Sequence, residues 1–77
     1  KVRVSKIHPN PAKDWVDIQL TSSQPVEINI FSLDGTILDV VLTKKVDKGK
    51  TSIPLFEYPK GLLIFKIGNK YHRIIHN

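Results

Sequence analysis

Several features are missing from this sequence of 77 residues, and each absence excludes a class of protein. It has no cysteine, so neither a disulfide nor a thiolate metal site can form, and packing alone must stabilise the fold. The longest uncharged apolar run, residues 61–65, is far shorter than the roughly 20 residues that cross a bilayer. Residues 1–4 alternate basic and apolar side chains and lack the apolar block of a signal peptide. Any N-terminal export signal is therefore expected upstream of this chain.

Acidic residues are scarce in the second half of the chain. Residues 1–39 hold four Lys or Arg and five Asp or Glu, whereas residues 40–77 hold eight and two. The halves therefore carry net charges of −1 and +6, which sum to the +5 of the whole chain. The densest basic stretch, residues 44–50, is predicted to be an exposed and solvated loop.

Helical periodicity is also absent, because apolar and polar residues alternate with a period of two along most of the chain. This alternation predicts an all-β protein. Turn residues separate the strands at spacings of roughly ten residues, which is typical of an immunoglobulin-like antiparallel β-sandwich. An open five-stranded barrel is the structural alternative. The seven predicted strands span residues 2–7, 15–20, 26–31, 36–42, 51–54, 62–67 and 70–75.

Proline and glycine mark the predicted turns. The Pro-Asn-Pro sequence of residues 9–11 forms a stiff corner, since proline fixes φ at about −65° and disfavours the α conformation in the preceding residue. Asp34–Gly35 predicts a two-residue type I′ hairpin turn. Residues 58–61 form a second corner, where Gly61 is expected to adopt a positive φ. Pro54 cannot donate to a ladder, so the strand that it ends is expected at a sheet edge.

No arrangement of residues indicates catalysis or metal binding. His72 and His76 are four residues apart on one strand, a separation of about 13 Å that is too large for ligands of one zinc ion. Asp14 and Asp17 point to opposite faces of an extended chain, which does not fit an acid–base pair. No serine lies in a nucleophile elbow, and no glycine-rich phosphate loop is present. We therefore expect neither an enzyme nor a bound cofactor.

A nucleic-acid-binding β domain remains an alternative, because the basic half places Phe65 and Tyr71 on neighbouring predicted strands. However, Phe65 alternates with Leu63 and Ile67, and this spacing favours the core over a stacking platform. No nucleic-acid partner is therefore expected.

The order of these features resembles a known family. The segments "HPNPAKDWVDI", "VEINIFSLDGTIL" and "IPLFEYPKGLLIFKIGNK", followed by "RII", are similar to the C-terminal sorting domain of bacterial type IX secretion. The resemblance covers nearly the whole chain. The family usually has Leu before the proline of the second corner and Tyr two residues after its glycine, where this chain has Tyr58 and Leu63. The family's basic ending is here reduced to Arg73.

The resemblance implies that residues 1–77 are a non-catalytic secretion signal with a β-sandwich fold, part of a larger exported protein. The cargo would precede the domain and cross the inner membrane by a separate signal peptide. The domain would fold in the periplasm and be recognised by the outer-membrane translocon. A sortase-like surface protease would then usually remove the domain, leaving the cargo at the cell surface or secreted. The expected recognition residues are Pro9, Asn10, Pro11, Leu33, Asp34, Gly35, Pro59, Gly61, Lys66, Ile67, Gly68, Lys70, Arg73, Ile74 and Ile75.

The last strand is expected to contact a partner protein in addition to its role in the fold. Its alternation puts Tyr71, Arg73 and Ile75 on one face, with His72 and Ile74 on the other, so one set must lie away from the core. An apolar residue beside a cation on an outer face suits a docking strip, because apolar burial gives affinity and charge gives orientation.

Two further interpretations concern partners. The first strand, residues 2–7, precedes a stiff corner and has alternating apolar residues, an arrangement that permits pairing with a second copy in a homodimer. An immunoglobulin-like adhesive or carbohydrate-binding module is the alternative function, and it predicts exposed aromatic side chains.

Overall fold

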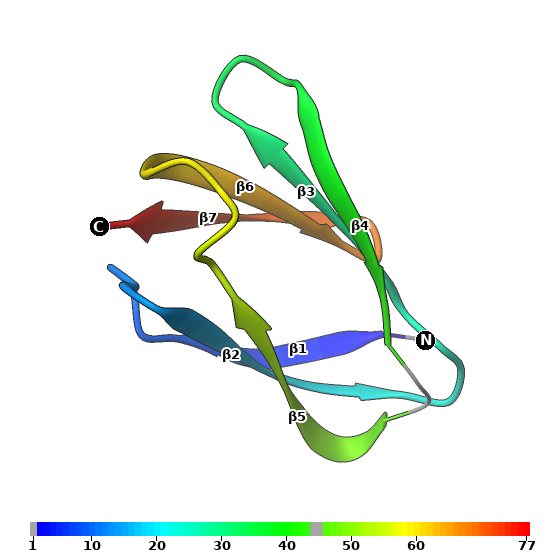
Figure 1. The fold of residues 1–77 in the computed structure, drawn as a ribbon. Helices are drawn as coiled ribbons and strands as arrows, with labels where there is room; N and C mark the ends of the chain where they lie inside the picture. Colours follow the sequence, from blue (N-terminus) through cyan, green and yellow to red (C-terminus); the bar gives the residue numbers. More distant parts are fainter. Residues whose placement is uncertain (1, 44–45) are drawn as a thin grey trace.

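The computed structural model describes residues 2–43 and 46–77 and confirms an all-β sandwich (Figure 1). One antiparallel sheet has three strands in the order β1-β2-β5, and the other has four in the order β4-β3-β6-β7. This is the immunoglobulin-like arrangement with the fourth strand placed beside the third. Because the strands form two layers, the five-stranded barrel alternative is wrong. The strands are β1 (Arg3–His8), β2 (Trp15–Ser22), β3 (Glu27–Ser32), β4 (Ile37–Leu42), β5 (Val46–Pro54), β6 (Gly61–Ile67) and β7 (Lys70–His76).

The core is built from the inward faces that the alternation predicted. On β2, Val16, Ile18 and Leu20 are at most 1% exposed. Phe65 of β6 is fully buried, which confirms its predicted place in the core. Each large apolar side chain that leaves water contributes roughly 1.5–3 kcal/mol, so this cluster supplies the stability that disulfides cannot. The buried apolar residues are Ala12, Val16, Ile18, Leu20, Val26, Ile28, Ile30, Ile53, Leu55, Leu63, Phe65, Ile67 and Ile74.

The prediction of a basic loop at residues 44–50 is wrong from residue 46 onward, because β5 begins at Val46. Pairing with β2 runs along nearly all of β5, and this ladder outweighs the polar composition of the segment. Lys44 and Lys45, which belong to the same prediction, lie outside the described residues. β5 is an edge strand and ends at Pro54, as predicted.

The β3–β4 hairpin lies at the predicted place, but its loop has three residues rather than two. Ser32 N donates to Thr36 O (2.9 Å) and Gly35 N donates to Ser32 O (3.0 Å). Gly35 has a φ of +91°, so a turn through Leu33 and Asp34 is followed by one left-handed residue. The Asp34 carboxylate accepts hydrogen bonds from Ser32 Oγ and Thr36 N, which favour the longer loop. The Ser32 bond, followed by the Thr36 bond, lowers the pKa of Asp34 below its ordinary value.

β6 lies between β3 and β7, which confirms its predicted central position. The turn into β7 consists of Gly68 and Asn69, with Ile67 paired to Lys70 across it. Gly68 has a φ of +62°, a conformation that glycine adopts at no steric cost. β7, like β4, is an edge strand of this sheet, so one side of its backbone is left for other partners.

Candidate functional site

The proline corner is joined to the last strand by the side chain of Asn10. Its Nδ2 donates to the carbonyl of Arg73 (3.0 Å), and its Oδ1 accepts from the N–H of Ile75 (3.0 Å). These backbone groups lie on the side of β7 that faces away from β6, its neighbour in the four-stranded sheet of the described residues. The side-chain amide of Asn10 thus makes the two hydrogen bonds that the backbone of a neighbouring strand would otherwise make. The peptide bonds before Pro9 and Pro11 are both cis.

Ala12 extends this contact through its main chain. Its N–H donates to the carbonyl of Ile75 (2.7 Å), and its carbonyl accepts from the N–H of Asn77 (2.8 Å). Ala12 is fully buried and forms a parallel bridge with His76. The segment that leaves the three-stranded sheet is therefore tied to the open edge of the four-stranded sheet.

His76 connects both proline corners from the inside. The residue is only 5% exposed. Its Nδ1 lies 3.0 Å from the carbonyl oxygen of Pro59, and its Nε2 lies 3.0 Å from the carbonyl oxygen of Lys13. In the β6–β7 ladder, His76 is also the partner of Gly61. The two corners and the end of β7 therefore meet at one end of the sandwich.

The second corner is fixed by Tyr58. Its N–H donates to the carbonyl of Leu55 (2.9 Å), and its hydroxyl donates to the carboxylate of Asp39 on β4 (2.7 Å). Burial raises the pKa of the Tyr58 phenol, and the hydrogen bond to Asp39 raises it further. Gly61 has the predicted positive φ, +109°. A Cβ at Gly61 would meet nothing within 4 Å, so the backbone conformation, not a lack of space, requires glycine.

The last strand has the two faces that its alternation predicted. Tyr71, Arg73 and Ile75 lie on the outer face, where Tyr71 is 64% and Ile75 46% exposed. Ile74 is fully buried and Ile67 is 2% exposed. These two members of the expected recognition set therefore pack in the core of the folded domain, because they occupy inward positions of their strands.

A groove of about 550 Å³ lies between β1 and β7, each an edge strand of its own sheet. Residues 4–7, Asn10 and residues 71–74 line it. His72 Nε2 is buried and has no hydrogen-bond partner among the described residues. Burial lowers the pKa of His72, and the nearby charge of Lys70 lowers it further. The imidazole is therefore neutral near pH 7.

The expected recognition residues divide between the two ends of the four-stranded sheet. Ser32, which precedes the hairpin loop, pairs with Leu63, and Leu63 pairs with Ile74, so that loop projects from the same end as the corners. β6 separates the two ends by about 20 Å. The corner end holds Pro9, Asn10, Pro11, Leu33, Asp34, Gly35, Pro59, Gly61, Arg73 and Ile75, and the other end holds Lys66, Gly68 and Lys70.

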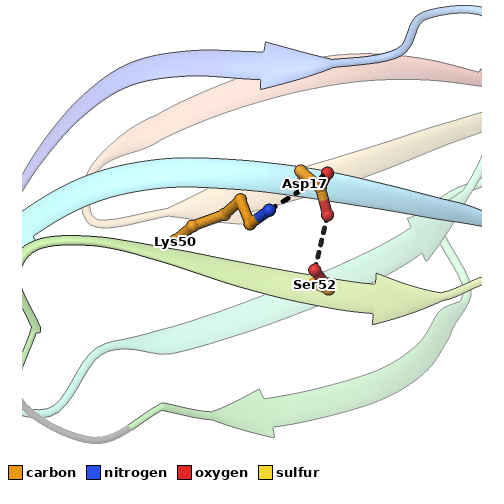
Figure 2. Close-up of polar contacts among 3 residues, drawn as sticks. All are labelled: Asp17, Lys50 and Ser52. Atoms are coloured by element: carbon orange, nitrogen blue, oxygen red, sulfur yellow. Dashed lines mark hydrogen bonds and ion pairs between the residues drawn. The ribbon is translucent and has the colours of Figure 1, made fainter.

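A polar cluster on the outer face of the three-stranded sheet was not predicted. Asp17 accepts a hydrogen bond from Ser52 Oγ (2.5 Å), and its carboxylate lies 3.9 Å from Lys50 Nζ (Figure 2). The bond from Ser52 holds the pKa of Asp17 below its ordinary value, and the charge of Lys50 adds to this effect. The cluster links β2 to β5.

Among the described residues, no group of three or more His, Asp or Glu side chains could hold a metal ion. No helix long and apolar enough to cross a membrane occurs in the described part of the chain. The described residues do bring together two rigid corners, a strand edge and an exposed strip of apolar and cationic side chains. Such a combination is typical of a protein-binding surface.

A comparison with known families identifies the chain. A family model described as "secretion system C-terminal sorting domain" matches residues 6–77. The chain belongs to this family. No curated protein and no solved structure matches the chain. Sorting domains of this family are non-catalytic secretion signals for the cargo of the type IX system, whose substrates are exported to the cell surface or secreted.

The most informative contacts of this sorting domain were missed by sequence reasoning. Ala12 and His76 hold the corner end together, yet neither belongs to the set of expected recognition residues. The alternation through His72 and Ile74 also places His76 on the inward face, and this was a weak indication that His76 is buried at the corner end. Which carbonyl groups His76 meets depends on loops that are far away in the sequence.

Proposed function

We propose that this sorting domain, residues 1–77, is part of a larger exported protein and presents one rigid folded surface to the outer-membrane translocon. Its cargo precedes it in the same chain and enters the periplasm by a separate signal peptide. A sortase-like surface protease then cuts upstream of the domain. The observation that carries this proposal is that the family match covers both corners and β7, to which Asn10 ties the first corner and His76 the second.

The recognition residues of the proposed surface have two roles. Pro9, Asn10, Pro11 and Gly61 fix the backbone at the corner end, because their hydrogen bonds and φ values set the path of the chain. Exposed side chains at the same end make the contacts. Leu33, 69% exposed at the tip of its hairpin, and Ile75 belong to this second group.

A fusion of the chain to a periplasmic reporter tests the proposed function. In a strain with an active type IX system, we expect the reporter at the cell surface or in the medium. In the same strain without the translocon, we expect the reporter to stay in the periplasm. A reporter that stays periplasmic while the system is active would contradict the proposal.

Deletion of residues 73–77 is a poor test of recognition, because it also removes the buried Ile74 and His76. Ile75→Thr is sharper, since threonine keeps the β-branched shape on an exposed position and removes apolar contact area. We expect export to fall while the melting temperature stays within a few degrees. Gln19→Thr, on the outer face of β2, is the matched control and should export normally.

The homodimer through the first strand stays a prediction. β1 is an edge strand, which leaves its outer side available for pairing. However, its register with β2 shifts between Val4 and Lys6, and a bulge of this kind disfavours the addition of another strand. We therefore expect at most weak association. Sedimentation that finds only monomer at high concentration would remove the dimer from the account.

The adhesive or carbohydrate-binding alternative predicts aromatic side chains gathered on one surface. Trp15 and Tyr71 are exposed, but they lie on the outer faces of different sheets, and Phe56, which is 78% exposed, lies in the segment between β5 and β6. This placement favours the sorting function over a glycan platform.

A further inference from the structure

The outer face of the four-stranded sheet is mostly apolar. Across β4, β3, β6 and β7, one row of outward residues is Ile37, Phe31, Ile64 and Arg73. The next row is Val40, Asn29, Lys66 and Tyr71. Leu62 and Ile75 form a neighbouring pair, and we refer to these ten residues as the apolar face. Ile37, Val40 and Tyr71 are 59%, 49% and 64% exposed, so the face is open to solvent.

The other sheet has an outer face of the opposite character. Its ladders place His8, Asp17 and Ser52 in one row, and Lys6, Gln19 and Lys50 in the next. An antiparallel sheet that faces water normally has polar side chains on that side, as this one does. One sheet therefore has a polar outer face and the other an apolar outer face. A large exposed apolar face is typical of a surface that binds a partner.

The charges on the apolar face indicate what covers it. Lys66 and Arg73 lie within the rows, and none of the described outward positions of β6 and β7 is acidic. Glu27 of β3 is the nearby carboxylate, and its Oε1 accepts a hydrogen bond from Asn29 Nδ2 (3.2 Å). The Lys66 ammonium lies 5.6 Å from the centroid of the Tyr71 ring. Both cations are thus available to carboxylates of a partner.

The charges of Lys66 and Arg73 distinguish between possible occupants. β6 is a central strand, and Lys66 lies in its last outward row beside the turn into β7, whereas Arg73 lies in the middle row of the face. A bilayer over the whole face would bury the charges of Lys66 and Arg73 without carboxylates opposite them, at a considerable cost in free energy. In a pair of these faces, two cations from each copy would meet one nearby carboxylate, Glu27, which already accepts a hydrogen bond from Asn29, so positive charge would be in excess. A protein surface with carboxylates opposite the cations has neither cost.

We propose that the apolar face docks onto a protein of the secretion machinery that presents apolar side chains and, opposite Lys66 and Arg73, carboxylates. The proposal rests on the sorting function and assigns the main contact to a sheet face in addition to the corner end. Burial of the apolar rows supplies affinity, and the two cations orient the domain and speed its association.

A charge-reversal pair tests this docking surface. The face variant is Lys66→Glu with Arg73→Glu, and the matched control is Arg3→Glu with Lys6→Glu on exposed positions of β1. Each protein is fused to the reporter, scored for export, and titrated against the purified, detergent-solubilised outer-membrane translocon. We expect the face variant to bind about tenfold more weakly or worse, and the control to bind within about twofold of wild type.

Circular dichroism and the melting temperature check that each variant folds. If the reversal unfolds the domain, Lys66→Gln with Arg73→Gln replaces it, with a smaller expected loss of binding. A folded face variant that binds and exports like wild type would overturn the inference while the sorting function stands. A wild-type fusion that neither binds the translocon nor leaves the periplasm would overturn the sorting function and, with it, this inference.

Two further measurements distinguish other occupants. Sedimentation that finds a wild-type dimer which the face variant lacks would overturn the proposal in favour of a second copy. Cosedimentation with anionic phospholipid vesicles, lost in the face variant while translocon binding is unchanged, would overturn it in favour of a membrane.

Discussion

At the scale of single residues, Asn10 carries the connection between the two sheets. Its amide donates to one backbone group of β7 and accepts from another. We expect Asn10→Ala to lower the free energy of unfolding by about 1–2 kcal/mol, since two modest hydrogen bonds are lost. Urea unfolding monitored by circular dichroism measures the change. Asn10→Asp keeps only the acceptor, so its free energy of unfolding should lie between those of the alanine variant and the wild type. An alanine variant as stable as the wild type would contradict the stabilising role of the two Asn10 hydrogen bonds.

His72 makes the stability depend on pH. Its pKa is lowered in the folded state, so the unfolded chain binds the proton more tightly, and stability is lost as the pH falls below about 6.5. Asp17 and Asp34 have lowered pKa values as well, so their contribution is lost in a separate window, below their ordinary value of 3.8. Unfolding midpoints measured between pH 8 and pH 3 should show two steps.

The step that His72 causes is expected to vanish in His72→Phe, which fills a similar shape and removes the buried nitrogen that has no partner among the described residues. His8→Gln is the control and should keep the step. If His72→Phe retains it, another group is responsible.

The direction in which the β7 side chains point was the part of the site that could be predicted from the sequence. The alternation correctly predicted that Tyr71, Arg73 and Ile75 share one face of β7, because a strand's side-chain period does not depend on its neighbours. The contacts of Asn10 and His76 could not be predicted, since their partners are more than 60 residues away or belong to another corner.

At the scale of elements, the turns were located correctly but not always typed correctly. Gly35 marked the β3–β4 hairpin, yet side-chain bonds to Asp34 select a loop of three residues. β5 begins five residues earlier than predicted, because its ladder with β2 overrides a polar sequence. The length of a loop and the start of a strand depend on pairing between strands, which the local sequence pattern does not predict.

Gly61, where the second corner enters β6, gives an element-scale prediction. Its φ of +109° strains any L-residue although space is available. We expect Gly61→Val to cost roughly 1–3 kcal/mol. The chain is short enough for chemical synthesis, so D-alanine at position 61 is the matched control, because it favours positive φ. L-valine that unfolds at the wild-type temperature would show that the corner tolerates another backbone path.

At the scale of the whole molecule, the sandwich has one solvated sheet, one apolar outer face and one end closed by two corners. The first corner has backbone bonds to β7 through Ala12, and the ring of His76 contacts the carbonyl groups of Pro59 and Lys13. A signal built in this way is a folded surface and not a linear motif, because its exposed residues come from strands far apart in the sequence. Export should therefore depend on the folded fraction of the domain.

The most direct measurement of that claim is the surface-exposed fraction of one reporter fused to the wild-type domain and to its Asn10→Ala, Gly61→Val variant. A small domain has a stability of roughly 5 kcal/mol, of which this pair of substitutions should remove about 2–5 kcal/mol. Neither substitution changes a side chain of the apolar face. We predict that the wild-type fusion reaches the surface and that the variant accumulates in the periplasm in proportion to its unfolded fraction. Normal surface display of a variant shown to be unfolded would contradict the account.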